Sequence, residues 1–270
     1  MNSCWATISL LYAFSIQNIK FIGLSHTISL AYLVAMEQII KTQRDGTKLI
    51  YLMDPLCGWC YGASGRIQQL VKSEDFSIEL LPVGLFSGSG ARNMDQNFAA
   101  YAWSNDQRIA KITGQEFSEA YRHQVLDRPN SIFDSSAATL ALTAVFLTST
   151  SAEIDALKII QQARYVHGLD ITDIDSLIEI LNKAGFVAAA DRLKNPDQAL
   201  INANQARITK GQHLLRAVHA RGVPTMVVIN DLEKRALVAG DLLGSFESLT
   251  STIKKTLSDF KLDTQEGELQ

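Results

Sequence analysis

Two cysteines three positions apart, Cys57 and Cys60, are the residues of this chain best suited to chemistry. The motif Cys57-Gly58-Trp59-Cys60 follows the apolar run 49–53 and precedes a segment with helical periodicity, so both thiols fall at the first turn of a predicted helix. Unpaired N–H groups and aligned peptide dipoles at a helix N-terminus stabilise a thiolate, which is the nucleophilic form of cysteine. We therefore predict that Cys57 is the nucleophile.

The spacing also predicts the second step of the reaction. Two cysteines on one opening helical turn face the same side and can close a small disulfide. Cys57 would form a mixed disulfide with a substrate, and Cys60 would resolve it; in reverse, the pair would donate its disulfide. The direction depends on the redox potential of the pair.

Two other interpretations of a Cys-x-x-Cys pair remain. A structural zinc site would need two further ligands at short spacing. The remaining cysteine and the histidines are instead scattered along the chain: Cys4, His26, His123, His167, His213 and His219. We predict no metal site. The last interpretation is a chance motif without a role.

A second motif lies far along the chain, at Gly222-Val223-Pro224-Thr225. It opens the apolar run 226–229, which predicts a strand that begins at a proline. Proline donates no N–H to a sheet, and X-Pro bonds adopt the cis form more readily than other peptide bonds. Either isomer fits the sequence, and an ordinary turn proline is the alternative.

Together the two motifs resemble the DsbA family of thioredoxin-fold proteins. The stretch 54–62, Asp-Pro-Leu-Cys-Gly-Trp-Cys-Tyr-Gly, is similar to the FrnE-like branch of that family, which comprises predicted protein disulfide isomerases. In the family the proline is cis and lies beside the thiols, and the residue before it offers its backbone to the substrate. The resemblance therefore implies these roles for Pro224 and Val223.

The remaining candidate residues surround these two motifs. We expect Trp59 to contact the substrate, and Gly58 and Thr225 to support the site. Asp54 could accept or relay the proton of Cys60, or it could cap the helix that follows, and the sequence favours neither. Five aromatic residues could line a groove beside the thiols, although their helical spacing is typical of core packing; they are Phe98, Tyr101, Trp103, Phe117 and Tyr121.

Composition agrees with a soluble globular protein. Hydrophobic residues make up 47% of the 270 residues, charged residues make up 20%, and the formal net charge is −3. This balance indicates no nucleic-acid partner. We expect no metal or organic cofactor: the Cys57–Cys60 disulfide itself would be the redox group, with glutathione as a candidate reductant. Partners would be protein or peptide thiols and disulfides, together with an unidentified redox partner.

The N-terminal extension, residues 1–47, differs from the rest. Its apolar runs at 8–14 and 28–35 are shorter than the about 20 residues of a membrane span, so we expect no stable membrane insertion. They also fit a secretory signal poorly, because no basic residue precedes the first run. We predict translation from Met36, with residues before about 36 outside the fold. A bacterial cytoplasmic location follows from that start, with the periplasm as the alternative.

The rest of the chain predicts an α/β protein, a thioredoxin-like fold with a large all-helical insertion of the DsbA-like kind. We expect strands over 48–53, 76–83, 225–230 and 235–240, a helix from Cys57 to 72, a loop over 84–90 and a last helix over 245–258. The thioredoxin-like domain would comprise 48–90 and 206–260. Residues 91–205 would form the inserted helical domain, and 261–270 a loose tail.

The helical segment from 91 to 221 carries recognisable boundaries. Thr150 to Glu153 reads as a capping box, Thr172 and Asp173 open a helix that stops at Gly185, and residues 195–197 open a long helix that ends at Gly222.

These features predict a thiol–disulfide oxidoreductase of the protein disulfide isomerase type. One alternative is a glutathione-dependent isomerase or kappa-class glutathione transferase-like enzyme on the same fold. Such enzymes typically carry a serine nucleophile or a glutathione-activating residue where this chain has Cys57, and they generally lack the paired thiol, so Cys60 argues against this alternative. The other is a peptide-binding or chaperone-like module in which the dithiol has no role.

Overall fold

The computed structural model describes most of the chain beyond the N-terminal extension. The described residues are 48–73, 75–230 and 233–267, with side chains described as far as residue 260. The predictions for residues 1–47, including the start at Met36, therefore lie outside the described residues. The same holds for part of the predicted turn between the last two strands.

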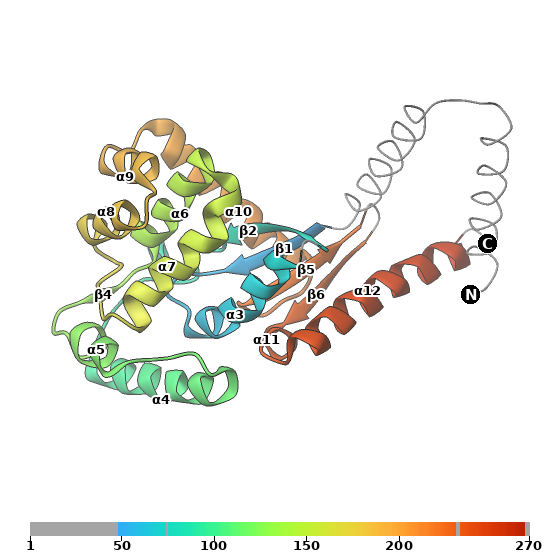
Figure 1. The fold of residues 1–270 in the computed structure, drawn as a ribbon, viewed down its shortest axis with the longest axis horizontal. Helices are drawn as coiled ribbons and strands as arrows, with labels where there is room; N and C mark the ends of the chain where they lie inside the picture. Colours follow the sequence, from blue (N-terminus) through green and yellow to red (C-terminus); the bar gives the residue numbers. More distant parts are fainter. Residues whose placement is uncertain (1–47, 74, 231–232, 268–270) are drawn as a thin grey trace, which may run out of the picture. The chain divides into compact units, whose positions relative to one another are not determined.

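A four-stranded mixed sheet in the order β2-β1-β5-β6 organises the fold (Figure 1). Its strands are β1 (Lys48–Met53), β2 (Ser77–Pro82), β5 (Thr225–Ile229) and β6 (Lys234–Val238). Strand β1 is parallel to β2 and antiparallel to β5, and it pairs Leu52 with Thr225. The chain that enters β5 therefore lies beside the chain that leaves β1, which positions two distant segments together.

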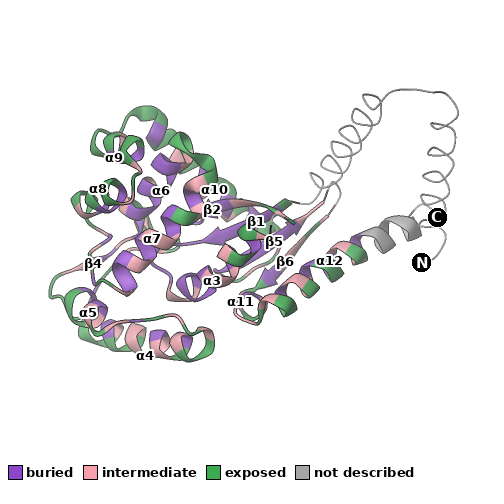
Figure 2. Ribbon diagram, viewed as in Figure 1, coloured by how far each residue is buried: buried purple, intermediate pink, exposed green. Residues whose placement is uncertain are grey.

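Helices cover both faces of this sheet and bury its central strands (Figure 2). They include α3 (Gly58–Lys72) on one face and α10 (Gln198–Ala217) on the other. Tyr51 of β1 belongs to the same apolar core as Ile67 of α3, whereas Ile50 packs with Leu214 of α10. Burial on both faces explains why β1 is an unbroken apolar run.

The segment between β2 and β5 is mostly helical. Its helices before α10 are α4 (Gln96–Thr113), α5 (Glu119–Tyr121), α6 (Ser136–Thr148), α7 (Glu153–Tyr165), α8 (Ile174–Lys183) and α9 (Val187–Lys194). Its short helical turns are η1 (Gly88–Gly90), η2 (Arg122–Leu126) and η3 (Thr150–Ala152). The predicted helical insertion is confirmed, and within it β3 (Arg92–Asn93) and β4 (Ile132–Phe133) form a two-stranded ribbon that the sequence did not predict. Strands of two residues are too short to leave an alternating pattern.

The predicted capping box at 150–153 was also wrong. Helix α7 begins at Glu153 directly after η3, with no side-chain cap. Thr150 Oγ1 donates to the carbonyl of Phe146 at 2.8 Å, and the Glu153 carboxylate pairs with Arg207. Both side chains of the expected box are therefore engaged elsewhere.

Helix α10 begins where the sequence predicted and ends earlier. The Asp197 side chain accepts a hydrogen bond from Leu200 N at 2.7 Å, as an N-cap residue does. The helix ends at Ala217 rather than at Gly222. His219 has φ 53°, in the left-handed region, where a right-handed helix cannot continue.

Helix α12 (Phe246–Gly267) is longer than the helix predicted over 245–258. The loose tail expected over 261–270 was therefore wrong for residues 261–267. No glycine or proline interrupts the sequence from Phe246 to Gly267, so no stop signal acts earlier. A short helix, α11 (Ala239–Leu242), connects β6 to α12.

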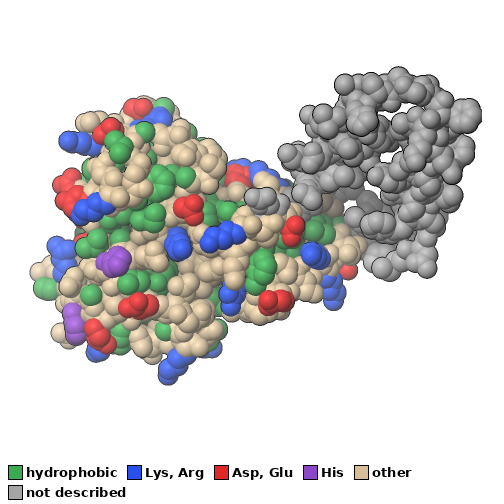
Figure 3. Space-filling model, viewed as in Figure 1, with side chains coloured by type: hydrophobic (Ala, Val, Ile, Leu, Met, Phe, Trp, Pro, Cys, Tyr) green, Lys and Arg blue, Asp and Glu red, His purple; other side chains and the backbone are tan. Residues whose placement is uncertain are grey.

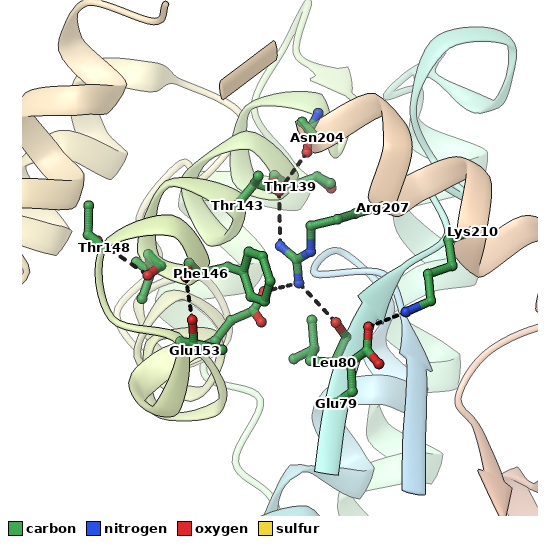
Figure 4. A network of polar contacts seen from close by, with 12 residues as sticks. Glu79, Leu80, Thr139, Thr143, Phe146, Thr148, Glu153, Asn204, Arg207 and Lys210 are labelled. Atoms are coloured by element: carbon green, nitrogen blue, oxygen red, sulfur yellow. Dashed lines mark hydrogen bonds and ion pairs between the residues drawn. The ribbon is translucent and has the colours of Figure 1, made fainter. Parts of the chain in front are cut away.

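A buried polar network joins the inserted helices to the sheet (Figure 4). Arg207 of α10 donates to the carbonyl of Leu80 in β2 at 2.9 Å and to Thr143 Oγ1 in α6 at 3.1 Å, and it pairs with Glu153 of α7. The side chains of Arg207 and Glu153 are 8% and 4% exposed. One guanidinium thus connects three helices to the strand next to β1.

Acidic and basic side chains are interspersed over the face shown in Figure 3. Of the helices that the structure describes, none combines the length and apolar character that crossing a bilayer requires. The described residues also contain no group of three or more His, Cys, Asp or Glu side chains placed to hold one metal ion.

Candidate active site

Cys57 lies at the junction between β1 and α3. It is the N-cap residue of α3 with extended backbone angles, φ −83° and ψ 114°, and its N–H donates to the carbonyl of Asp54 at 3.1 Å. The tight turn after β1 therefore delivers Cys57 to the start of the helix. Cys57 and Cys60 are both free thiols, and their exposed fractions are 5% and 0%. Cys57 is thus the sulfur that a substrate can reach first.

The chain before β5 lies against this thiol. Cys57 Sγ is 3.7 Å from the carbonyl oxygen of Val223, a residue 166 positions away, and the Val223–Pro224 peptide bond is cis. Pro224 is buried, and Thr225 Oγ1 donates to the carbonyl of Gly222 at 2.7 Å. The structure therefore brings together the two motifs singled out in the sequence.

Cys60 is enclosed behind Cys57. Burial, together with the hydrogen bond and charge of Cys57, raises the pKa of the Cys60 thiol well above its ordinary value. The Tyr51 hydroxyl donates to the Cys60 carbonyl at 3.2 Å, and burial with the two nearby sulfurs raises the pKa of Tyr51 as well. Cys60 is therefore protonated at neutral pH and sheltered from external disulfides.

Asp54 fixes the turn before Cys57. Its carboxylate is fully buried and accepts hydrogen bonds from Leu56 N (2.9 Å), Phe86 N (3.1 Å) and Ser135 Oγ (2.8 Å). Burial raises the pKa of Asp54, and these hydrogen bonds oppose the shift. The alternative in which Asp54 caps α3 was wrong, because Cys57 is the N-cap and Asp54 binds Leu56 before the helix begins. The proton-relay role stays a prediction.

A cavity of about 320 Å³ opens beside Cys57. Trp59 forms part of its wall, with the Arg108 guanidinium 5.8 Å from the Trp59 ring centre. Of the five aromatic residues considered from the sequence, three line this cavity: Phe98, Tyr101 and Tyr121. The groove interpretation therefore fits these three. The other two are positioned differently, because Phe117 packs against Tyr61 and Trp103 lines another depression.

Three residues near the site left no signal in the sequence. Asp106 of α4 lines the cavity, Ser135 holds Asp54, and the Tyr165 hydroxyl donates to the carbonyl of Leu56 at 2.8 Å. Each comes from the inserted segment, many residues from the cysteine motif. Only the packing of that segment against the sheet brings them to the thiols, so no local pattern could have marked them.

Gly58 allows α4 to approach the first turn of α3. A Cβ atom at this position would lie 2.3 Å from Asp106 Oδ1 and 3.3 Å from Ile109 Cδ1. We expect Gly58→Ala to lower the free energy of unfolding by about 1–3 kcal/mol, because a well-packed contact must shift. Urea unfolding followed by circular dichroism measures the change.

Gly65 provides the matched control in the same helix. Its added Cβ would lie 3.2 Å from Gln115 Nε2, the end of a flexible side chain. Gly65→Ala should therefore be neutral or stabilising by up to about 1 kcal/mol, through helix propensity. Equal effects of the two substitutions would contradict the assigned contact. The double variant Gly58→Ala/Asp106→Ala should recover part of the loss.

Comparisons with known proteins concern the family and the fold. The family model described as DSBA-like thioredoxin domain matches residues 48–248. No curated protein matches the chain. Among solved structures, the cytosolic disulfide reductase DsbM from Pseudomonas aeruginosa is 27% identical with a TM-score of 0.69, over 78% of this chain and 98% of that chain.

Two further solved structures are informative. The same reductase determined with GSH is 27% identical with a TM-score of 0.65, over 78% of this chain and 99% of that chain. A 2-hydroxychromene-2-carboxylate isomerase is 17% identical with a TM-score of 0.51, over 78% of this chain and 98% of that chain. The second likeness concerns the fold alone.

Proposed function

This chain belongs to the family of DSBA-like thioredoxin domains, and from that premise we propose that Cys57 and Cys60 are the pair with which it exchanges disulfides. The chain is a thiol–disulfide oxidoreductase, in keeping with its family and with the disulfide reductase it resembles. The observation that carries the residue assignment is the position of Cys57 Sγ, at a helix start and 3.7 Å from the carbonyl of Val223.

The proposed reaction proceeds in two exchanges. The Cys57 thiolate attacks one sulfur of the substrate disulfide, forms a mixed disulfide and expels the other sulfur as a thiolate. Cys60 then loses its proton and attacks the Cys57 sulfur, which releases the second substrate thiolate and leaves a Cys57–Cys60 disulfide. The substrate gains two electrons and the protein pair loses two. Val223 and Pro224 would form the edge against which the substrate chain lies, with Trp59 beside it.

We propose that the pair works in the reducing direction, as in the related cytosolic reductase. Strongly oxidising pairs are those whose reduced form is stabilised, and neither Gly58 nor Trp59 supplies a charge that would stabilise a thiolate. Two molecules of glutathione could restore the dithiol, since the related reductase has been determined with GSH. Protein or peptide disulfides would be the substrates, and a cytosolic location suits this direction.

The isomerase alternative shares the fold, so the fold does not separate the two functions. The pair of thiols, Cys57 and Cys60, distinguishes disulfide exchange from the isomerase reaction. Cys60 has no use in a reaction that needs one nucleophile, whereas an exchange reaction needs it to release the product. Its buried position behind Cys57 supports that use.

The equilibrium reduction potential of the Cys57–Cys60 pair tests the proposal. Protein carrying Cys4→Ser is equilibrated with glutathione buffers, and its free thiols are trapped and counted by mass spectrometry. We expect both cysteines to oxidise together, with a potential closer to about −270 mV, as in thioredoxin, than to about −120 mV, as in DsbA. A value near the second figure would contradict the reducing direction. Failure of the pair to form a disulfide in any buffer would refute the function itself.

A further inference from the structure

The cavity beside Cys57 has the features of a substrate-binding site. It lies between the first turn of α3 and helix α4, and aromatic rings form much of its wall. Tyr101 at its rim is 66% exposed, so the cavity is open to solvent. A disulfide attacked by Cys57 must place its second, departing sulfur near this thiol, and the cavity provides the space.

Asp106 contributes a carboxyl group to this cavity. The residue is 5% exposed, and its Oδ2 accepts a hydrogen bond from the Tyr121 hydroxyl at 2.9 Å. Its Oδ1 accepts none from any residue that the structure describes. This free oxygen lies beside Gly58, because a Cβ atom there would be 2.3 Å away, and Gly58 itself lines the cavity. The buried Asp106 carboxyl thus has one oxygen without a protein hydrogen bond, and this oxygen lies beside Gly58, the residue that follows the nucleophile Cys57 in the sequence.

The residues behind Asp106 hold it in place. Tyr121 is 2% exposed, and the Arg164 guanidinium lies 5.4 Å from its ring centre. Burial raises the pKa of Asp106 to about 7, while the Tyr121 hydrogen bond and the charge of Arg164 act in the opposite direction. The other ionisable groups that line the cavity are Cys57, Arg92, Tyr101, Tyr121 and Tyr165. The carboxyl group is therefore fixed in geometry and able to exchange a proton near neutral pH.

We propose that Asp106 is a catalytic acid, which protonates the sulfur that departs when Cys57 attacks a substrate disulfide. This role rests on the proposed function. An electron pair of the Cys57 thiolate forms the new S–S bond, and the substrate S–S bond breaks with its pair on the departing sulfur. Asp106 gives its proton to that sulfur and becomes a carboxylate. In the reverse reaction the carboxylate takes the proton of an incoming thiol, so the step needs no other reactant.

Asp54, the other acid near the thiols, is not suited to this step. Both of its oxygens accept hydrogen bonds from the protein, and the side chain is fully buried. Tyr165 donates its hydroxyl to the carbonyl of Leu56. Among the described residues that line the cavity, Asp106 is the one carboxylic acid.

The proposed role of Asp106 can be tested by varying the basicity of the thiolate that departs. An alkyl thiolate is a poor leaving group that gains from protonation, whereas a thiolate of low pKa departs readily without it. The probes are two small neutral disulfides, hydroxyethyl disulfide and dithiodipyridine, which release a basic and a weakly basic thiolate. Reduced protein carrying Cys4→Ser reacts with each in a single turnover, with and without Asp106→Asn.

We expect Asp106→Asn to slow reaction with hydroxyethyl disulfide about 100-fold and reaction with dithiodipyridine less than about 3-fold. In the unmodified protein the hydroxyethyl disulfide rate, divided by the fraction of Cys57 thiolate measured by ultraviolet absorbance at each pH, should fall as the pH rises through about 7, and Asp106→Asn should abolish this fall. Tyr121→Phe keeps the acid but removes its hydrogen bond, so that fall should move to higher pH. This second variant serves as the test if Asp106→Asn does not fold.

Equal slowing with both disulfides, or no slowing with either, would show that Asp106 is not an acid in this reaction. For Tyr121→Phe, an unchanged pH profile would be the contradicting result. A wild-type protein that reacts with neither disulfide would instead refute the proposed function, so the two failures are distinguishable.

Discussion

Cys57→Ser will slow disulfide reduction at least about 1,000-fold, because a hydroxyl replaces the more accessible of the two cysteine thiols that the structure describes. Cys57 is 5% exposed and Cys60 is fully buried. Insulin reduction with glutathione as electron donor measures the loss, in a Cys4→Ser background so that the cysteine at position 4 cannot contribute. The binding-module alternative predicts the opposite, since a peptide-binding activity would survive this substitution.

Cys60→Ser will have a different outcome when the reduced protein is mixed with insulin in the absence of glutathione. Cys57 can still attack, but nothing resolves the mixed disulfide, so substrate should remain attached to Cys57 in a one-to-one complex. Non-reducing electrophoresis and mass spectrometry of the attachment site detect this complex. Attachment to Cys60 in the Cys57→Ser variant would reverse the two assigned roles.

The sequence predicted the parts of the fold that depend on local patterns. The unbroken apolar run of β1, the helix that follows Cys57 and the proline that precedes β5 all carry signals that short-range physics explains. Their joint position also follows from topology: once β5 is antiparallel to β1, the residues before Thr225 must lie beside the end of β1. The two motifs at the site can therefore be found from the sequence alone.

The surroundings of the thiols could not be predicted in this way. Asp106 and Tyr165 reach the site only because the inserted helices pack against α3, and helix packing depends on many contacts distant in sequence. The same reason applies to Glu153. It looked like part of a capping box, whereas a partner on α10 determines its position.

Removing one partner of the buried ion pair between Arg207 and Glu153 should strongly destabilise the fold. Arg207→Met should lower the free energy of unfolding by about 3–5 kcal/mol at pH 8, because it leaves the Glu153 carboxylate buried without its partner. Burial raises the pKa of Glu153 to about 7, and Arg207 opposes this shift. At pH 5 the native carboxyl is protonated, so the loss should be smaller. Guanidinium unfolding at the two pH values measures both quantities.

The raised pKa of Glu153 also makes the free energy of unfolding of the unmodified protein depend on pH. Between about pH 4.5 and pH 7 the native state holds a proton on Glu153 that the unfolded state has released, so this contribution to stability is complete at low pH and is lost as the pH rises. Glu153→Gln should flatten that part of the profile. In Arg207→Met/Glu153→Leu, no unpaired charge remains, and an apolar pair of similar volume is often neutral or stabilising. If the double variant is as unstable as Arg207→Met, the cost comes from lost packing around Phe146 and Thr143 rather than from the buried charge.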